Sequence, residues 1–202
     1  MKNEITDHER SALDKLFAQT ELVAKGQMAR TGKIHTAMVL MTADNKFIDL
    51  ESSQLEFIAK QGKFRQVVQA ACIEADVVAS TMLLPNILTA KDDKQEVALI
   101  LGGTRTLREE RAMPVMRTAY GHFLGFAETW HLPHSPESEK FQDFIPKEEP
   151  SKTERLQAKT ALCHIGMVMS RPCDHGHHPY REEEDHEEDK RQEQGRGLDQ
   201  SL

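Results

Sequence analysis

The sequence predicts an α+β protein in which an antiparallel sheet carries helices on one face. Near the start of the chain, apolar residues recur at the spacing of a helix. Further along, short apolar runs are separated by turn residues, and few helical segments lie between them. The expected order of elements over residues 1–131 is α-β-β-α-β-β-β-β. Strands that follow one another without a crossover helix pair antiparallel, which places the domain in the α+β class.

The first expected helix covers residues 7–29. Thr6 and Glu9 have the spacing of a capping box, which satisfies the free backbone N–H groups at a helix start. Apolar residues and one threonine then follow at helical spacing: Leu13, Leu16, Phe17, Thr20, Val23, Ala24 and Met28. Thr31-Gly32 is expected to end the helix, and its charged outer side indicates that it lies on another part of the fold.

A β-hairpin is expected next, with strands at residues 34–42 and 47–50. The connection contains Asp44-Asn45, and both residue types tolerate the left-handed conformation of a tight turn.

A second helical region is expected to begin at Ser52-Ser53, where either hydroxyl is able to cap a helix. The apolar residues that keep a helical period are Leu55, Phe57, Ile58, Phe64, Val67, Val68, Ala71 and Cys72. Gly62 interrupts this region, so we expect a break or a bend there.

The remainder of the domain has a β pattern. Expected strands cover residues 76–84, 87–90, 96–101, 116–120 and 123–130. Pro85-Asn86 is expected to form a turn or bulge, and the charged residues 91–94 a second turn.

The chain changes character at residue 132. Prolines spaced among polar residues predict a linker over 132–150, and a second capping box at Ser151 and Glu154 predicts one amphipathic helix over 151–169. Its stripe of Leu156, Ile165 and Val168 is too small for stability alone, so we expect the helix to be a docking element. Residues 170–202 have no apolar periodicity and are expected to be a disordered acidic His-rich tail, which leaves 1–131 as the domain that folds by itself.

Composition and charge argue against a membrane-spanning or a secreted protein. The 202 residues have a formal net charge of −7, and residues 171–202 alone hold 10 acidic against 5 basic side chains. The run from Val77 to Leu88 is broken by Pro85 and is shorter than the ~20 residues of a membrane helix, so no membrane span is expected. The first residues are charged and do not resemble a secretory signal, and three cysteines form no disulfide framework. We therefore expect a cytoplasmic protein.

One cluster of metal-ligand types lies in the tail, at Cys173, His175, His177 and His178, followed by acidic residues 182–189. Thiolate and imidazole are preferred ligands of Zn²⁺ and also bind Ni²⁺. The spacing matches no zinc finger or ribbon, so the expectation is loose binding of Zn²⁺ or Ni²⁺, or no binding at all. No other cofactor is expected.

Candidate catalytic groups are few. Cys72 is the only thiol within 1–131, and His35, His122 and His131 are the histidines considered as its base. Cys72 continues an apolar helix face, which favours an inert core side chain. Gly102-Gly103 followed by Arg105 lacks the remaining residues of a phosphate-binding loop, so a turn at the end of a strand is expected.

The only arginine-rich stretch contains Arg105, Arg108, Arg111 and Arg117. Glu109 and Glu110 interrupt it, and a domain of nearly zero net charge does not indicate nucleic-acid binding. We expect a solvated loop.

These observations favour a non-enzymatic protein-interaction or accessory module, in which the sheet domain or the helix at 151–169 contacts a partner protein. One alternative is a metal-binding accessory protein that uses its tail. Another is a small enzyme or ligand-binding domain with a pocket near His35, Cys72, Arg105 and His122.

Overall fold

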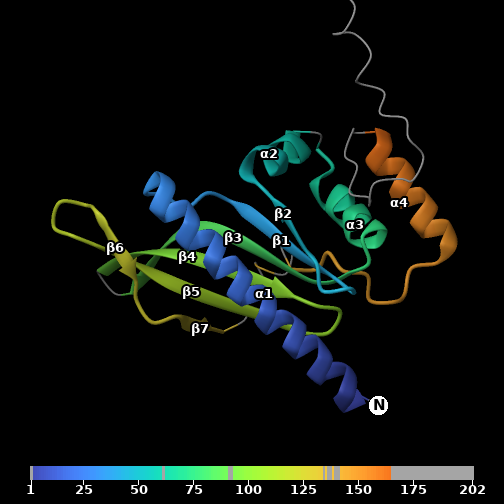
Figure 1. The fold of residues 1–202 in the computed structure, drawn as a ribbon, viewed down its shortest axis with the longest axis horizontal. Coiled ribbons are helices and arrows are strands. Elements are labelled where there is room, and N and C mark those ends of the chain that lie inside the picture. The colour runs from blue at the N-terminus through green and yellow to red at the C-terminus, as the bar shows by residue number, and fades with distance from the viewer. Residues whose placement is uncertain are drawn as a thin grey trace, which may run out of the picture. The chain divides into compact units, whose positions relative to one another are not determined.

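The computed structural model describes residues 2–60, 62–90, 93–133, 135, 138 and 142–164. Over these residues the chain has four helices and a curled antiparallel sheet of seven strands, which confirms the predicted α+β class (Figure 1). All of them belong to one compact unit, Met1–Met169. The expected tail at 170–202 lies outside the described residues.

The strands are β1 (Ala37–Thr42), β2 (Phe47–Leu50), β3 (Val77–Ala90), β4 (Asp93–Gly103), β5 (Arg108–Arg117), β6 (Phe123–Phe126) and β7 (Trp130–Leu132). The helices are α1 (Lys2–Thr31), α2 (Ser52–Lys60), α3 (Phe64–Glu74) and α4 (Lys152–His164). The order in the sheet is β2-β1-β3-β4-β5-β6, and β7 pairs with the part of β5 that β6 leaves free.

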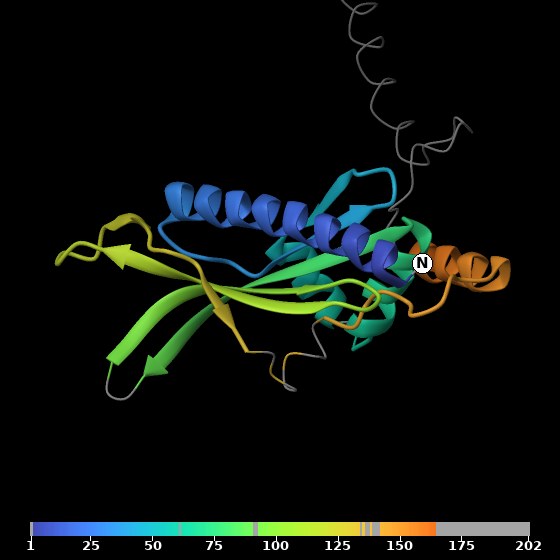
Figure 2. The same ribbon diagram turned by 90° about the horizontal axis from the view of Figure 1, so that it is seen from below.

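Helix α1 confirms the first predicted helix and runs along one face of the sheet (Figure 2). It begins at Lys2, so Thr6 and Glu9 lie inside the helix and the capping box predicted at its start is wrong. Its buried side chains include nearly all of the predicted stripe: Leu13, Leu16, Phe17, Thr20, Ala24 and Met28. The helix ends as expected at Gly32, which has φ +67° and donates its backbone N–H to the Met28 oxygen at 2.9 Å. Glycine adopts this left-handed conformation without a steric penalty.

The helices lie on both faces of the sheet, which differs from the one-sided arrangement expected. Alternate residues of β1 point to opposite faces, and every residue of this strand is buried. Val39 packs with Leu16 of α1, whereas Met38 and Leu40 pack with α2 and α3. A strand whose residues are buried on both faces needs a cover on both sides.

The predicted turn and break are confirmed. Asn45 has φ +58° between β1 and β2, and Gly62 has φ +67° between α2 and α3. At both positions, the residue type allows the left-handed backbone that the chain reversal needs.

The turn or bulge predicted at Pro85-Asn86 is wrong, because β3 continues through both residues in regular register and Pro85 pairs with Ala98 of β4. Strand β1 pairs with β3 only as far as Leu83. Within the described residues, the other edge of β3 is therefore unpaired at Pro85, and proline is tolerated at such an edge because no ladder bond is lost there.

The second half of the sheet also differs from the prediction. The arginine-rich stretch, expected as a solvated loop, forms most of β5. Of the strand expected at 116–120 only the first two residues are in a strand, at the end of β5, and the strand expected at 123–130 is confirmed only over β6, with β7 beginning at Trp130. Charged residues on both faces of β5 hide the alternation that would have indicated a strand.

Part of the segment expected as a linker belongs to the core. Phe144 and Ile145 are buried together with residues of β1, β3 and α3. The helix expected after it is present as α4, which packs on α3 through Ala158 and Leu162. The last residues of the predicted helix, 165–169, lie outside the described residues.

No helix in the described part of the chain combines the length and hydropathy that crossing a bilayer requires.

Candidate functional site

The sheet face opposite α1 carries exposed apolar side chains at its β5–β6–β7 end. Met116, Leu124 and Trp130 are 42%, 65% and 43% exposed. We call these three residues the open patch.

Strand register places Met116 and Trp130 of the open patch on one face. Trp130 of β7 pairs with Ala112 of β5, and side chains of directly opposite residues share a face. Met116 lies four residues after Ala112, so it points the same way. Met116 also pairs with Gly125, and its Cε lies 3.5 Å from the place where a Cβ on Gly125 would be.

Leu124 lies in an irregular part of β6, next to Gly125, the strand partner of Met116. The register between β5 and β6 shifts between Met116 and Arg117, which leaves Leu124 without a direct partner. Phe123 and Phe126, on either side, pack toward α1 in an edge-to-face pair with centroids 5.2 Å apart. An irregularity of this kind interrupts the alternation of side chains along the strand, and Leu124 is left exposed there.

Apolar residues continue the open patch across the sheet. Val97 and Pro114 pair with each other on this face, and both are buried by their neighbours. The helices of the described chain cover other regions: α1 lies on the opposite face, and α2 and α3 contact β1 and β3. Figure 2 shows this separation, with α1 on one side of the sheet and α3 toward the end of the other side.

The turn between β5 and β6 projects a tyrosine beside the open patch. Tyr120 is 89% exposed. The hydroxyl of Thr118 accepts hydrogen bonds from the backbone N–H groups of Tyr120 and His122, at 3.3 and 3.1 Å. The turn is thus ordered by its own side chains, and it holds Tyr120 in solvent.

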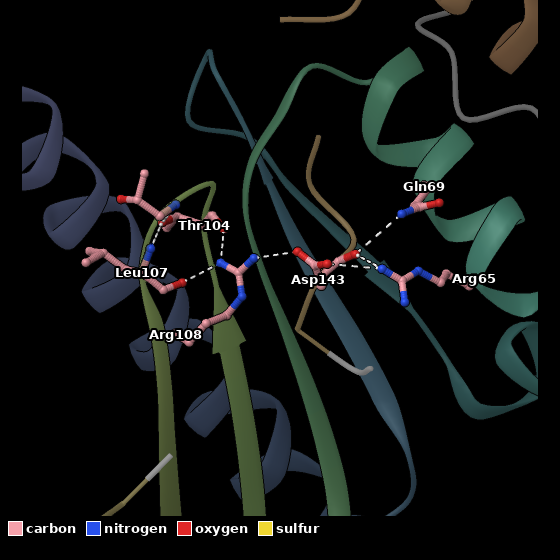
Figure 3. A network of polar contacts seen from close by, with 7 residues as sticks. Arg65, Gln69, Thr104, Leu107, Arg108 and Asp143 are labelled. Atoms are coloured by element: carbon pink, nitrogen blue, oxygen red, sulfur yellow. Dashed lines mark hydrogen bonds and ion pairs between the residues drawn. The ribbon is translucent and has the colours of Figure 1, made fainter. Parts of the chain in front are cut away.

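Three of the four arginines expected in a solvated loop are used within the fold. Arg108 Nη2 donates to Asp143 Oδ1 at 2.7 Å, and Arg65 of α3 reaches the other oxygen of Asp143 at 3.1 Å. Figure 3 shows Asp143 between these two arginines, with Gln69 donating to its backbone oxygen. This network fastens the 142–145 segment to β5 and α3.

Arg111 is held under α1. Its guanidinium lies 3.9 Å from the ring centroid of Phe17 and donates to Asp14 and Glu109, at 2.8 and 2.7 Å. Cation–π contact and charge pairing explain why the side chain is accommodated with only 15% exposure.

Arg117 contacts the chain just after the C-terminal end of α1. It makes two hydrogen bonds with Glu96, at 2.7 and 2.8 Å, and donates to the Gly32 oxygen at 3.1 Å. The paired guanidinium holds the pKa of Glu96 below its ordinary value. Arginines paired in this way do not form a basic surface for phosphate groups.

The residues considered for an enzyme or ligand-binding pocket do not converge in the structure. Arg105 precedes β5 and His122 follows it, and a ten-residue strand is roughly 30 Å long. His35 is exposed after α1, where Gln27 accepts its backbone N–H at 2.8 Å. Cys72 is buried among apolar side chains, and this burial raises the pKa of its thiol to about 12. A thiol in such a place has almost no thiolate at neutral pH.

The described residues contain no group of three or more His, Cys, Asp or Glu side chains placed to hold a metal ion. The predicted ligands are Cys173, His175, His177 and His178. They lie outside the described residues, so loose binding of Zn²⁺ or Ni²⁺ there stays a prediction.

Sequence reasoning missed the open patch because it considered residue 130 only as the end of an expected strand over 123–130. The strands concerned have four and three residues, which is too short for an alternation to be read. The signal within the sequence was the single tryptophan close to the end of the sheet region.

Comparison of the chain with known protein families, with curated proteins and with solved structures finds no match.

Proposed function

We propose that this chain is a cytoplasmic, non-enzymatic protein-interaction module that contacts a partner protein through the open patch. The carrying observation is the exposure of Met116 and Trp130 on one sheet face, together with exposed Leu124 beside Gly125, the strand partner of Met116. Soluble proteins seldom leave tryptophan, methionine and leucine together in water, and these clusters mark contact surfaces.

The composition of the open patch supports a protein partner. Tryptophan and methionine are enriched at protein–protein interfaces, and tryptophan is among the residues that contribute most to binding. Tyr120, on the adjoining turn, adds an aromatic ring with a polar end, which suits the rim of such an interface. The partner is expected to bring apolar side chains of its own.

The arrangement of polar groups supports a role without catalysis. The arginines of β5 that are paired with carboxylates serve the fold, and the thiol of Cys72 is buried. The residues considered for a pocket are spread over both ends of β5 and the interior. The proposal therefore rests on the open patch and not on a pocket.

Two leucines of similar exposure allow a matched test. Leu124 is 65% exposed in the open patch, and Leu22 is 60% exposed on α1, on the other side of the sheet. A photo-crosslinking amino acid at position 124 should give one discrete covalent adduct in cells. The same photo-crosslinking amino acid at position 22 should give no adduct of that mass.

The adduct identifies the partner by mass spectrometry, and binding is then measured by calorimetry with both purified proteins. Trp130→Ala should weaken binding by at least about 2 kcal/mol, as expected for a central aromatic residue. Leu124→Arg should abolish binding, and Leu22→Arg should leave it unchanged. Equal adducts at both positions, or binding that Leu124→Arg leaves intact, contradict the proposal.

A further inference from the structure

Helix α3 has apolar side chains on two sides. Val68 and Cys72 face the sheet core, whereas Val67, Ala70 and Ala71 face outward and pack with α4. Ile58 of α2 extends this outward surface. We call Ile58, Val67, Ala70 and Ala71 the α3 outer face.

The contact with α3 buries few of the described side chains of α4. Ala158 and Leu162, four residues apart on one side of the helix, are the only buried side chains among those described in α4. Leu156 points away from this contact and is 67% exposed. Arg155 pairs with Asp76 at the rim, and exposed ion pairs of this kind contribute little.

The connection to α4 is well suited to release. Phe144 and Ile145 anchor the chain in the sheet core, and residues 146–151 that follow are exposed or half-buried. This connector has proline at positions 146 and 150, and proline favours extended backbone in the residue before it. The buried core around Phe144 includes neither Ala158 nor Leu162, and Phe64 is the one described side chain that packs against both this core and the α4 contact.

We propose that the α3 outer face is a helix-binding surface and that α4 is its detachable occupant. A helix of 13 residues is marginal in water by itself, so α4 folds as it docks and unfolds as it leaves. The surface fits an amphipathic helix with a small residue followed four positions later by leucine, the pattern that α4 supplies in the same chain. This inference is independent of the open patch and concerns a second surface.

Hydrogen exchange on the full chain tests the release of α4. Amides of α4 should exchange at least about a hundredfold faster than those of β3 and β4, because a local opening costs less than global unfolding. Leu162→Ala should accelerate exchange in α4 at least about tenfold without affecting β3 and β4. The control Leu156→Ala should change hydrogen exchange neither in α4 nor in β3 and β4. Equal protection of α4 and the central strands, or a uniform loss of protection in Leu162→Ala, overturns the proposal.

A synthetic peptide of residues 151–164 tests the surface. The full-length Leu162→Asp variant should remain folded with its own α4 undocked, and it should bind the fluorescent peptide at least about tenfold more tightly than the unmodified chain, where α4 competes. The Leu156→Asp variant should behave like the unmodified chain. The same peptide carrying Leu162→Asp should bind none of them. Failure of Leu162→Asp to fold, absence of peptide binding, or equal binding to all variants contradicts a detachable occupant.

Discussion

Phe144 meets Phe64 edge to face, with ring centroids 6.0 Å apart and ring planes at 76°. Phe64 is the first residue of α3, and Phe144 lies in a segment whose composition predicted a linker. The side chain of Phe144 is fully buried. This pair, together with the Arg65–Asp143–Arg108 network, makes the segment part of the domain.

Phe144→Ala should therefore lower the free energy of unfolding by about 3–5 kcal/mol, the range for removing a buried phenylalanine side chain. Urea denaturation followed by circular dichroism measures it. Tyr120→Ala, which removes an aromatic ring from solvent, should stay within about 0.5 kcal/mol. Similar effects of the two variants would mean that Phe144 does not pack in the core.

A fragment of residues 1–131 should unfold at a lower denaturant concentration than the full chain or lose its cooperative transition. It lacks Phe144 and Ile145, whose absence uncovers Leu40, Met82 and Val68. A fragment of residues 1–164 should keep the transition of the full chain. Equal stability of both fragments would show that the core is complete without the 142–145 segment.

The sequence predicted those elements in which one physical signal dominates. The helical period over Leu13, Leu16 and Phe17 corresponds to a helix with one buried face. Asn45 and Gly62 stand where the backbone has positive φ, and few other residue types adopt this conformation readily. At such positions, local chemistry decides the structure.

Elsewhere the structure depends on partners that are distant in the sequence. Arg108 and Arg111 lie within a strand because Asp143 and Asp14 neutralise them, and neither carboxylate is near them in the chain. Phe144 and Ile145 are two apolar residues among charges and prolines, which no periodicity reveals. The open patch was missed for a related reason, because the exposure of Trp130 depends on where the helices stop covering the sheet.

Gly103→Ala should destabilise the chain, whereas Gly26→Ala should stabilise it. A Cβ on Gly103 would lie 2.6 Å from the backbone oxygen of Gln142, so the strand or the 142–145 segment must shift. A Cβ on Gly26 meets nothing within 4 Å, and alanine is favoured over glycine in a helix by up to about 1 kcal/mol. Thermal unfolding of the two variants should shift in opposite directions. A stabilising Gly103→Ala would mean that the backbone of Gln142 does not lie against β4.

The Glu96–Arg117 pair should make stability depend on pH in the acid range. The hydrogen bonds from Arg117 lower the pKa of Glu96, so the folded state releases the proton more readily than the unfolded state. The stabilisation is complete above the ordinary pKa of the carboxyl group and is lost as the pH falls through the lowered value. Because Glu96 is 40% exposed, the effect should be below about 1 kcal/mol.

Denaturation of Glu96→Gln at several pH values should show a flatter acid limb than that of the unmodified chain. Asp49→Asn provides a control of opposite sign, because partial desolvation on the exposed strand β2, with a smaller effect from Glu51, raises the pKa of Asp49. Its charge costs stability at neutral pH, and that cost disappears as the pH falls. Parallel acid limbs for Glu96→Gln and the unmodified chain would show that the pair does not couple to folding.

Cys72 should be unreactive in the folded chain. Burial raises the pKa of its thiol to about 12, and thiol reagents attack the thiolate. In a variant with Cys173→Ser, a chromogenic disulfide reagent at pH 8 should modify the exposed Cys163 quickly and reach Cys72 only at the rate of unfolding.

Above pH ~8.5 the unfolded state ionises the thiol of Cys72 and the folded state does not, so stability should fall as the pH rises there. Cys72→Ala should remove this alkaline dependence, lower stability by about 1–2 kcal/mol and leave the adduct at position 124 unchanged, because the thiol fills the core and does not act in binding. Fast labelling of both thiols, or loss of the adduct at unchanged stability, would instead assign Cys72 to a functional surface.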